Sequence, residues 1–186
     1  MDQGWSDERL MLAYRDGDAE AFTRLYERYR TKLFRHLAHQ CGNQALAEEL
    51  YQDVWTKVIA ARRSYEPLAT FATWIFRIAH HRLLDHYRKN GRDALQTYAD
   101  DAVLDQIPGP ARQEPAAAAE HNNIALRIST ALAALPAAQR EAFLMAEAGG
   151  MTLEEIAAAT ASQRETVKSR LRYALGKLRF ALEDLR

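Results

Sequence analysis

Residues 151–185 limit the possible folds most strongly, because they combine two helix-start signals with one basic helix. Thr152 is followed three residues later by Glu155, and Ser162 is followed three residues later by Glu165. Each pair has the spacing of a capping box, in which a hydroxyl and a carboxylate satisfy backbone N–H groups at a helix start. The sequence therefore predicts a short helix, a tight turn and a second helix, which together form a helix-turn-helix.

The second of these helices has an apolar side and a basic side. Helical periodicity predicts one buried stripe, made of Val167, Leu171, Leu175, Leu178 and Leu182. The other side carries mostly positive charge, from Arg164, Lys168, Arg170, Arg172, Lys177 and Arg179. A basic helix after a tight turn is typical of a helix that reads the DNA major groove, although a charged face can also be merely solvated.

The formal net charge of zero conceals separate charged blocks. The 186 residues include 25 Lys or Arg and 25 Asp or Glu, so the opposite charges cancel. Residues 71–92 and the chain after residue 160 are basic, whereas residues 93–124 are acidic. Two basic blocks favour contacts with phosphates. The single cysteine, Cys41, excludes an internal disulfide, and no signal-like start or membrane-length apolar run occurs, so we expect a cytoplasmic protein without membrane insertion.

Helical periodicity covers most of the chain, and no segment alternates as a strand would. Helices are predicted at about residues 7–16, 19–40, 44–62, 70–89, 124–135 and 137–148. Residues 93–121 interrupt the pattern with clustered Asp, Pro and Gly, which indicates a flexible acidic linker. The expected fold class is all-α, with two small helical domains at 1–92 and 122–186 joined by that linker.

The sequence contains no convincing catalytic or metal-binding group. His36, His39 and Cys41 lie close enough in sequence to suggest a metal site, and an enzyme using them is one alternative. We interpret them instead as one helix end with a stray thiol. No nucleophile has a base at motif spacing, so no catalytic residue, metal or cofactor is predicted and an enzyme is not expected.

Four short motifs of the C-terminal part occur together in one known family. They are Leu135-Pro136, Gln139-Arg140-Glu141, Glu154-Glu155-Ile156-Ala157 and Thr166-Val167-Lys168-Ser169-Arg170. This combination resembles region 4 of bacterial sigma factors, in the extracytoplasmic-function group of the sigma-70 family. The segments DGDAEAFTRLYERYRTKLFRHL, AEELYQDVWTKV and FATWIFRIAHHRLLDHYRK resemble region 2 of the same proteins, in the same order. The resemblance covers the chain apart from the linker.

The resemblance implies a transcription initiation factor that binds core RNA polymerase, directs it to promoters and assists DNA strand opening. The implied partners are promoter DNA, the β′ clamp coiled coil and β subunit of the polymerase, and an anti-sigma factor. The residues expected to contact the upstream (−35) element are Arg140, Arg164, Thr166, Lys168, Ser169, Arg172 and Tyr173. Those expected to contact the downstream (−10) element are Ser64, Tyr65, Arg77, His81, Arg88 and Lys89. The expected polymerase-docking residues are Glu48, Glu49, Gln52 and Asp53.

Within these surfaces, some residues have expected roles that the structure can examine. Tyr65 is the expected stacking partner for an extruded base, whereas Phe71 and Trp74 have core spacing. Relatives usually carry Leu-Gly-Ile where this chain has 160–162 (Thr-Ala-Ser), so we expect a tight, shifted or strained turn there. Many relatives also carry Asn in place of His81, which leaves the base preference open.

Two further interpretations concern the chain as a whole. The main alternative function is a stand-alone helix-turn-helix regulator, which would leave the four N-terminal helices without a role. The acid-rich linker at 93–115 is expected to enter the positively lined RNA channel of the polymerase as an anionic stand-in for the transcript.

Overall fold

The computed structural model describes residues 4–89 and 117–183, which contain helices and no strand, so the all-α prediction is confirmed. The N-terminal half (residues 4–89) contains α1 (Asp7–Arg15), α2 (Ala19–Cys41), α3 (Gln44–Ala60), the 3-10 turn η1 (Arg62–Ser64) and α4 (Phe71–Lys89). The C-terminal half (residues 117–183) contains α6 (Ala117–Ala133), α7 (Ala137–Glu147), α8 (Leu153–Ala159) and α9 (Arg164–Ala181). The linker prediction at 93–115 lies outside the described residues, but 117–121, also assigned to the linker, are the first turn of α6.

Side chains just before the helices explain where several of them begin. Asp18 accepts hydrogen bonds from the backbone N–H groups of Glu20 and Ala21, and Asn43 accepts one from Leu46. Such caps satisfy N–H groups that have no partner inside the helix. The start of α4 is capped from a distance, because the Glu8 carboxylate of α1 accepts a 2.7 Å hydrogen bond from the Phe71 N–H. This contact fixes the loop at 65–70 against α1.

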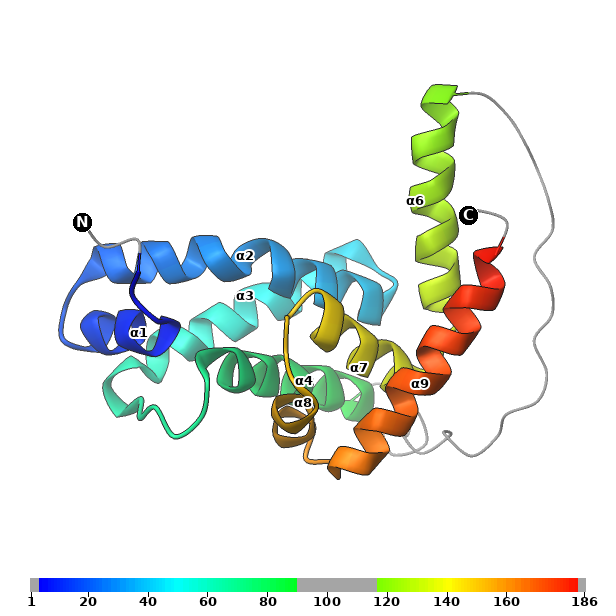
Figure 1. Cartoon of the computed structure of the whole chain (residues 1–186). Helices are drawn as coiled ribbons and strands as arrows, with labels where there is room; N and C mark the ends of the chain where they lie inside the picture. The colour runs from blue at the N-terminus through cyan, green and yellow to red at the C-terminus, as the bar shows by residue number, and fades with distance from the viewer. Residues whose placement is uncertain (1–3, 90–116, 184–186) are drawn as a thin grey trace.

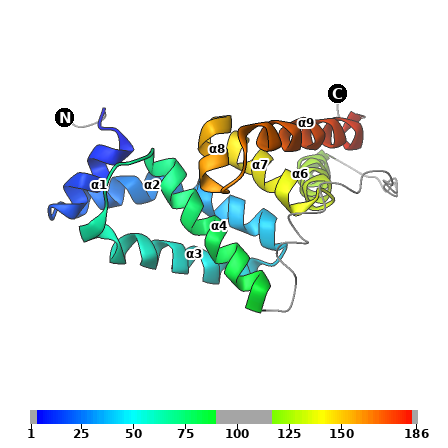
Figure 2. The same ribbon diagram turned by 90° about the horizontal axis from the view of Figure 1, so that it is seen from below.

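The two halves pack against each other. In Figure 1, α7 and α8 lie against the helices of the N-terminal half, and Figure 2 shows α7, α8 and α9 on one side of α2 and α4, with α3 on the other. Helix α7 contacts α2, and α8 contacts α4. The sequence predicted two domains, but not this close contact between them.

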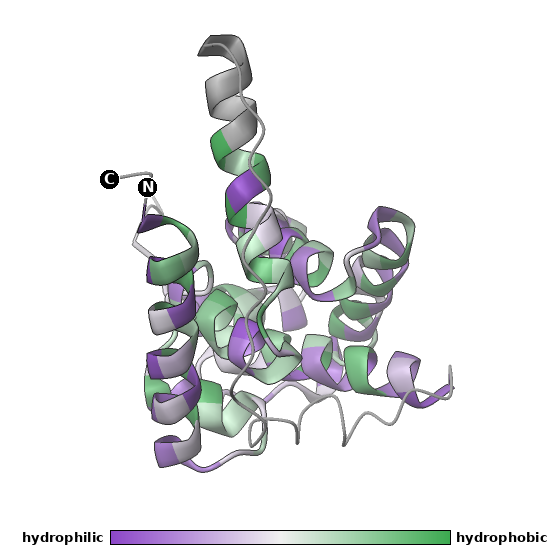
Figure 3. Ribbon diagram, turned by 90° about the vertical axis from the view of Figure 1, so that its right-hand side faces the viewer, coloured by the Kyte–Doolittle hydropathy of each residue, from purple (hydrophilic) through white to green (hydrophobic). Residues whose placement is uncertain are grey.

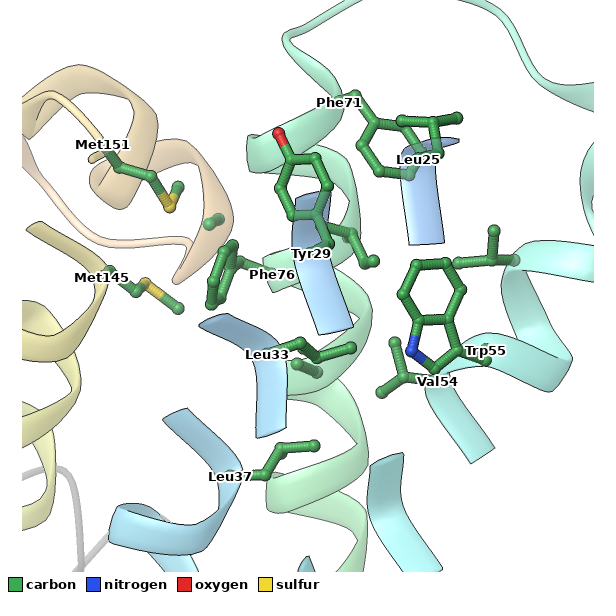
Figure 4. Close-up of a cluster of buried hydrophobic side chains, with 14 of the residues drawn as sticks. Leu25, Tyr29, Leu33, Leu37, Val54, Trp55, Phe71, Phe76, Met145 and Met151 are labelled. Carbon is green, nitrogen blue, oxygen red and sulfur yellow. The ribbon is translucent and has the colours of Figure 1, made fainter. Parts of the chain in front are cut away.

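The main hydrophobic core crosses the boundary between the halves. Figure 4 shows Met145 and Met151 from the C-terminal half beside Phe76 of α4 and Leu33 of α2. Phe76, Leu33 and Met145 are fully buried, and Met151 is 6% exposed. Since burying one such side chain contributes about 1.5–3 kcal/mol, these few residues alone give the contact substantial stability.

A second, smaller cluster lies within the C-terminal half, between α6, α7 and α9. Its buried members are Ala131, Leu132, Leu135, Leu144, Ala174 and Leu178. Figure 3 shows α6 rising above the rest of the molecule, with hydrophobic residues among the polar ones in its coloured lower part. This cluster gives α6 and α9 a packing site that does not involve the N-terminal half.

The buried stripe of α9 differs from the predicted one. Leu175 is 37% exposed, and Ala174 is fully buried in its place. The stripe therefore passes through Val167, Leu171, Ala174 and Leu178. Repeated four-residue steps advance about 40° past each full turn, so a step of three is needed to return to the same face.

Candidate nucleic-acid and polymerase interfaces

The helix-turn-helix consists of α8, the turn at 160–163 and α9. The predicted capping box at the start of α8 is present: Thr152 Oγ1 accepts from the Glu155 N–H at 3.2 Å, and Glu155 Oε2 accepts from the Thr152 N–H at 2.8 Å. The second predicted box is wrong. The residue that precedes α9 is Gln163, which makes no side-chain cap, and the Ser162 hydroxyl accepts a 3.0 Å hydrogen bond from Arg170.

The turn contains a left-handed alanine, which confirms the expectation of strain. Ala161 has φ 50°, and it is the one non-glycine residue with positive φ in the described ranges. For a residue with a Cβ atom this conformation costs roughly 1–2 kcal/mol. The neighbouring Thr160 hydroxyl donates to the Ser162 hydroxyl at 3.1 Å, which helps to hold the turn.

Relieving this strain gives the first prediction. Ala161→Gly is expected to stabilise the protein by about 1 kcal/mol, because glycine adopts positive φ without steric cost. Thermal unfolding followed by circular dichroism would measure the change. Ala158→Gly, at an exposed position inside α8, is the matched control and should instead destabilise by about 0.5–1 kcal/mol. A lower melting temperature for both variants would contradict a strained turn.

The side chains expected to read DNA lie at the surface of α9. Lys168, Arg172 and Tyr173 are exposed, and Thr166 and Ser169 are half-buried. A surface groove is lined by Thr166, Ser169 and Tyr173 together with Glu165 and Arg170. The Arg172 guanidinium lies 5.0 Å from the centre of the Tyr173 ring, so these two side chains present a joined cationic and aromatic surface.

Acidic neighbours surround the positive charges at the start of α9. Arg164 forms ion pairs with Glu154 of α8 and with Glu165, and Lys168 Nζ lies 3.5 Å from Glu165. These side chains are half-exposed or more, so water and salt screen each pair and its contribution to stability is small. DNA phosphates could therefore displace the carboxylates at low cost.

Arg140 does not lie on this surface, in contrast to its predicted phosphate contact. Its Nε atom donates to Gln40 Oε1 of α2 at 3.1 Å, and its Nη1 atom donates to the Ala133 carbonyl at the end of α6 at 3.1 Å. The Arg140 guanidinium thus joins α7 to the N-terminal half. The sequence could not show this, because Gln40 and Arg140 are 100 residues apart.

The residues of α4 expected to contact the −10 element are exposed. Arg77, His81, Arg88 and Lys89 lie at the surface, and steps of four and seven place the first three on one side of the helix. The pKa of His81 is lowered by partial burial and by the nearby charges of His80 and Arg77. The His81 ring is therefore neutral at physiological pH and has both a hydrogen-bond donor and an acceptor.

Ser64 and Tyr65 precede α4, and only the serine is exposed. The Tyr65 side chain is 3% exposed and packs edge-on against Trp74, with ring centres 5.0 Å apart. The prediction that Tyr65 stacks on an extruded base is thus wrong for this conformation. Burial, followed by the charges of Glu8 and Asp7, raises its pKa to about 12. Phe71 is fully buried, as its spacing predicted, and Trp74 is partly buried.

The acidic face of α3 divides into exposed and paired residues. Glu48, Glu49 and Gln52 are exposed. Asp53 is half-buried and accepts a 2.6 Å hydrogen bond from Arg82 of α4. Asp53 therefore joins α3 to α4, and the other three expected docking residues are the exposed ones.

His36, one of the three possible metal ligands in the sequence, lies at the contact between the halves. In the described ranges, no three His, Cys, Asp or Glu side chains are placed to hold a metal ion. His36 and His80 instead flank Glu141, a buried carboxylate of α7 that sequence reasoning missed. Its position in a helix gave no signal that residues from α2 and α4 would surround it. Among the described helices, none combines the length and apolar character needed to cross a bilayer.

Comparison with known proteins gives a consistent family assignment. The family description "Sigma-70 region 2" matches residues 25–93, and "Sigma-70, region 4" matches residues 125–178. The ECF RNA polymerase sigma factor RpoE of Cereibacter sphaeroides is 35% identical over 174 residues, covering 91% of each chain. The RNA polymerase sigma factor CarQ of Myxococcus xanthus is 32% identical over 175 residues, covering 94% of this chain and 97% of the relative.

Two solved structures share the fold. The sigma factor RpoE of Bartonella quintana, solved with the anti-sigma factor NepR, has a TM-score of 0.66 and 25% identity, over 90% of this chain and 100% of that chain. CnrH, solved with the cytosolic domain of CnrY, has a TM-score of 0.67 and 22% identity, over 96% of this chain and 97% of that chain. Since both halves match in order and full-length relatives exceed 30% identity, the chain belongs to the extracytoplasmic-function group of the sigma-70 family of RNA polymerase sigma factors.

Proposed function

We propose that the two exposed basic surfaces of this sigma factor divide the work of promoter recognition, with α9 reading the −35 element and α4 engaging the −10 element. The observation that carries this proposal is that the expected contact residues Lys168, Arg172, Arg77 and Arg88 are all exposed on these two helices. The chain performs no chemical step of its own, since RNA synthesis belongs to the polymerase that it directs. It acts in the cytoplasm, where the polymerase and promoter DNA are.

On α9, Lys168, Ser169, Arg172 and Tyr173 contact base edges, and Arg164 and Thr166 contact phosphates near the helix start. Helix-turn-helix proteins place the recognition helix in the major groove with its N-terminal part against the bases. Arginine and lysine recognise guanine there through two acceptor atoms. Arg140, which is engaged with Gln40, has no part in this surface while the halves are packed together.

On α4, Arg77, Arg88 and Lys89 hold the phosphates of the DNA strand that separates at the −10 element. Positive side chains along a groove are the usual means of holding a single strand. His81 and Ser64 offer neutral hydrogen-bonding groups to an extruded base. The buried Tyr65 supports the loop from beneath rather than stacking on the base.

The exposed carboxylates Glu48 and Glu49, with Gln52, dock on the clamp coiled coil of the β′ subunit, and the C-terminal half contacts the β subunit. The first contact would be steered by opposite charge. An anti-sigma protein also binds this chain and controls its access to the polymerase. The solved RpoE of Bartonella quintana is in complex with such a protein, which supports this part of the proposal.

Transcription in vitro with core polymerase and a promoter library tests the proposal. The full chain should make core polymerase start at one class of promoters sharing −35 and −10 sequences, and core alone should not. A gel shift with duplex promoter separates the alternative, because a stand-alone regulator would bind the duplex without polymerase. Tight binding to duplex DNA without any effect on start-site choice would overturn the proposed function.

A further inference from the structure

One buried acidic side chain joins the two halves of the protein. Glu141 of α7 is 1% exposed, and its Oε1 atom lies 2.9 Å from Nδ1 of His80 on α4 and 3.9 Å from Nε2 of His36 on α2. His36 is fully buried, and neither of its ring nitrogens has a hydrogen-bond partner within the described residues. The His36 ring packs edge-on against the Phe76 ring, with ring centres 5.2 Å apart. Glu141 therefore brings a charge to a site that only the packing of the two halves creates.

Two further sets of polar contacts connect the halves. Gln40 of α2 accepts from Arg140 and donates to the Ala137 carbonyl at 3.4 Å, so the end of α2 is tied to the start of α7. At the other end, the Thr70 hydroxyl donates to Glu155 Oε1 at 2.7 Å. This second contact sets the start of α8 against the loop before α4. The closed arrangement thus holds α8 against the loop before α4, while the residues proposed to engage the −10 element stay exposed.

A closed chain is too small to perform the proposed function. Elements centred near −35 and −10 are about 25 base pairs apart, which is about 85 Å at roughly 3.4 Å per base pair. A compact chain of 186 residues has a radius of gyration of only about 16 Å. The halves must therefore separate before α9 and α4 can occupy both elements. This step of the argument rests on the proposed function, whereas the packing of the free chain does not.

We propose that Glu141, His36 and His80 form a proton-operated latch, which keeps the two halves together at neutral pH and releases them on mild acidification. In the closed arrangement the His36 ring of α2 is fully buried beside α4 and α7, where an uncharged ring is favoured. A proton on His36 would place a charge in that site beside other positive groups. Opening exposes the ring to water, which solvates the protonated form and removes the penalty of burying its charge.

The direction of the pH effect follows from the groups that face His36. The pKa of His36 is lowered from 6.5 to about 4, chiefly by burial; the charge of Glu141 on α7 opposes this shift, and the charges of His80 on α4, His39 on α2 and Arg140 on α7 add to it. The closed form therefore binds fewer protons than the open form, and its extra stability is present above pH 6.5 and lost as the pH falls towards 4. Between pH 7.5 and pH 5 the ratio of open to closed protein should rise about 25-fold.

Glu141 itself stays ionised through this range. Burial raises its pKa, but the charge and hydrogen bond of His80, with the charges of His36 and Arg170, outweigh burial and hold the pKa below its usual value. Its contribution to closing is therefore present above about pH 4.5 and lost only at more acid pH. Glu141 therefore does not produce the response between pH 7.5 and pH 5.

Thiol labelling of a cysteine placed between the halves measures the open fraction. We would use the full chain with Cys41→Ser and Met145→Cys, because Met145 is fully buried and faces Phe76 across the contact (Figure 4). Ala174→Cys, which is fully buried inside the smaller cluster of the C-terminal half, reports unfolding of that half. Ala158→Cys, exposed on α8, gives the rate at which the reagent labels an accessible thiol at each pH. The labelling rates of the two buried cysteines are divided by this rate.

The normalised labelling of Met145→Cys should rise about 25-fold from pH 7.5 to pH 5, while Ala174→Cys stays slow. Adding His36→Phe, which keeps a buried ring but cannot take up a proton, should abolish the rise. Adding Glu141→Lys should give fast labelling already at pH 7.5, and Glu147→Lys, exposed on the same helix, should not. Equal acceleration at Met145→Cys and Ala174→Cys, or an unchanged rise with His36→Phe, would overturn the latch. Neither polymerase nor DNA is present, so the result is independent of the promoter-recognition proposal.

Discussion

Glu48→Lys combined with Glu49→Lys is expected to lower the affinity for core RNA polymerase about a hundredfold or more. Both carboxylates are exposed on α3, and lysines there would meet the partner surface with repulsion that costs several kcal/mol. Titration of labelled protein with core polymerase at two salt concentrations would measure the change. The loss should be smaller at high salt, since charges at the rim of an interface are screened.

A matched charge reversal separates docking from net charge. Glu27→Lys combined with Glu147→Lys changes the total charge equally but lies on α2 and α7, so polymerase binding should remain close to that of the unaltered protein. Asp53 is left unchanged because its contact with Arg82 holds α3 against α4. Helicity should be the same in all three proteins. If the Glu48 and Glu49 double variant still co-purifies with core polymerase, the docking surface lies elsewhere.

The second large effect is expected at the exposed face of α9. Lys168→Ala and Arg172→Ala should each weaken binding by roughly 1–3 kcal/mol at promoters that carry the contacted base. This corresponds to about a 5- to 150-fold loss of affinity. Promoters that lack that base should be affected little. Binding of the complete polymerase complex to a set of −35 variants would measure the discrimination.

Arg164 is the internal comparison for this face. Because Arg164 is assigned a phosphate contact, Arg164→Ala should weaken binding to all promoters evenly. The slope of log K against log salt concentration should fall by about one unit. The loss also leaves Glu154 without its arginine partner and Glu165 with Lys168 alone, which places unneutralised negative charge near the DNA and adds to the even weakening. Identical effects of the Lys168, Arg172 and Arg164 substitutions on every promoter would contradict the assigned roles.

Local sequence signals gave most of the helices, because caps and periodicity act within a few residues. Asp18 and Asn43 cap α2 and α3 in the structure, and the capping box at Thr152 starts α8 as predicted. The start of α9 was placed wrongly, since Gln163 and not Ser162 precedes the helix, and the Ser162 hydroxyl accepts a hydrogen bond from Arg170, 8 residues further along the chain. A nearby hydroxyl can serve more than one donor, and the sequence does not show which donor binds it.

The candidate sites were predictable where they depend on exposure along a single helix. Lys168 and Arg172 follow this rule, and both are exposed as expected. Tyr65 and Arg140 do not, because their surroundings come from distant segments: α4 covers the tyrosine ring, and Gln40 binds the arginine. The surroundings of Glu141 were hidden for the same reason, since nothing in the periodicity of α7 identifies α2 and α4 as its neighbours.

The core that passes from Phe76 to Met145 also bears on how the gene could be cut and rejoined. If residues 1–92 and 117–186 were made as two polypeptides, each would display a matching apolar surface and would find the other without any covalent connection. Such a split sigma factor would assemble at a strength set by the face containing Met145, Met151 and Ile156. Its activity would then depend on the concentrations of two gene products, which would turn one regulator into a two-input switch.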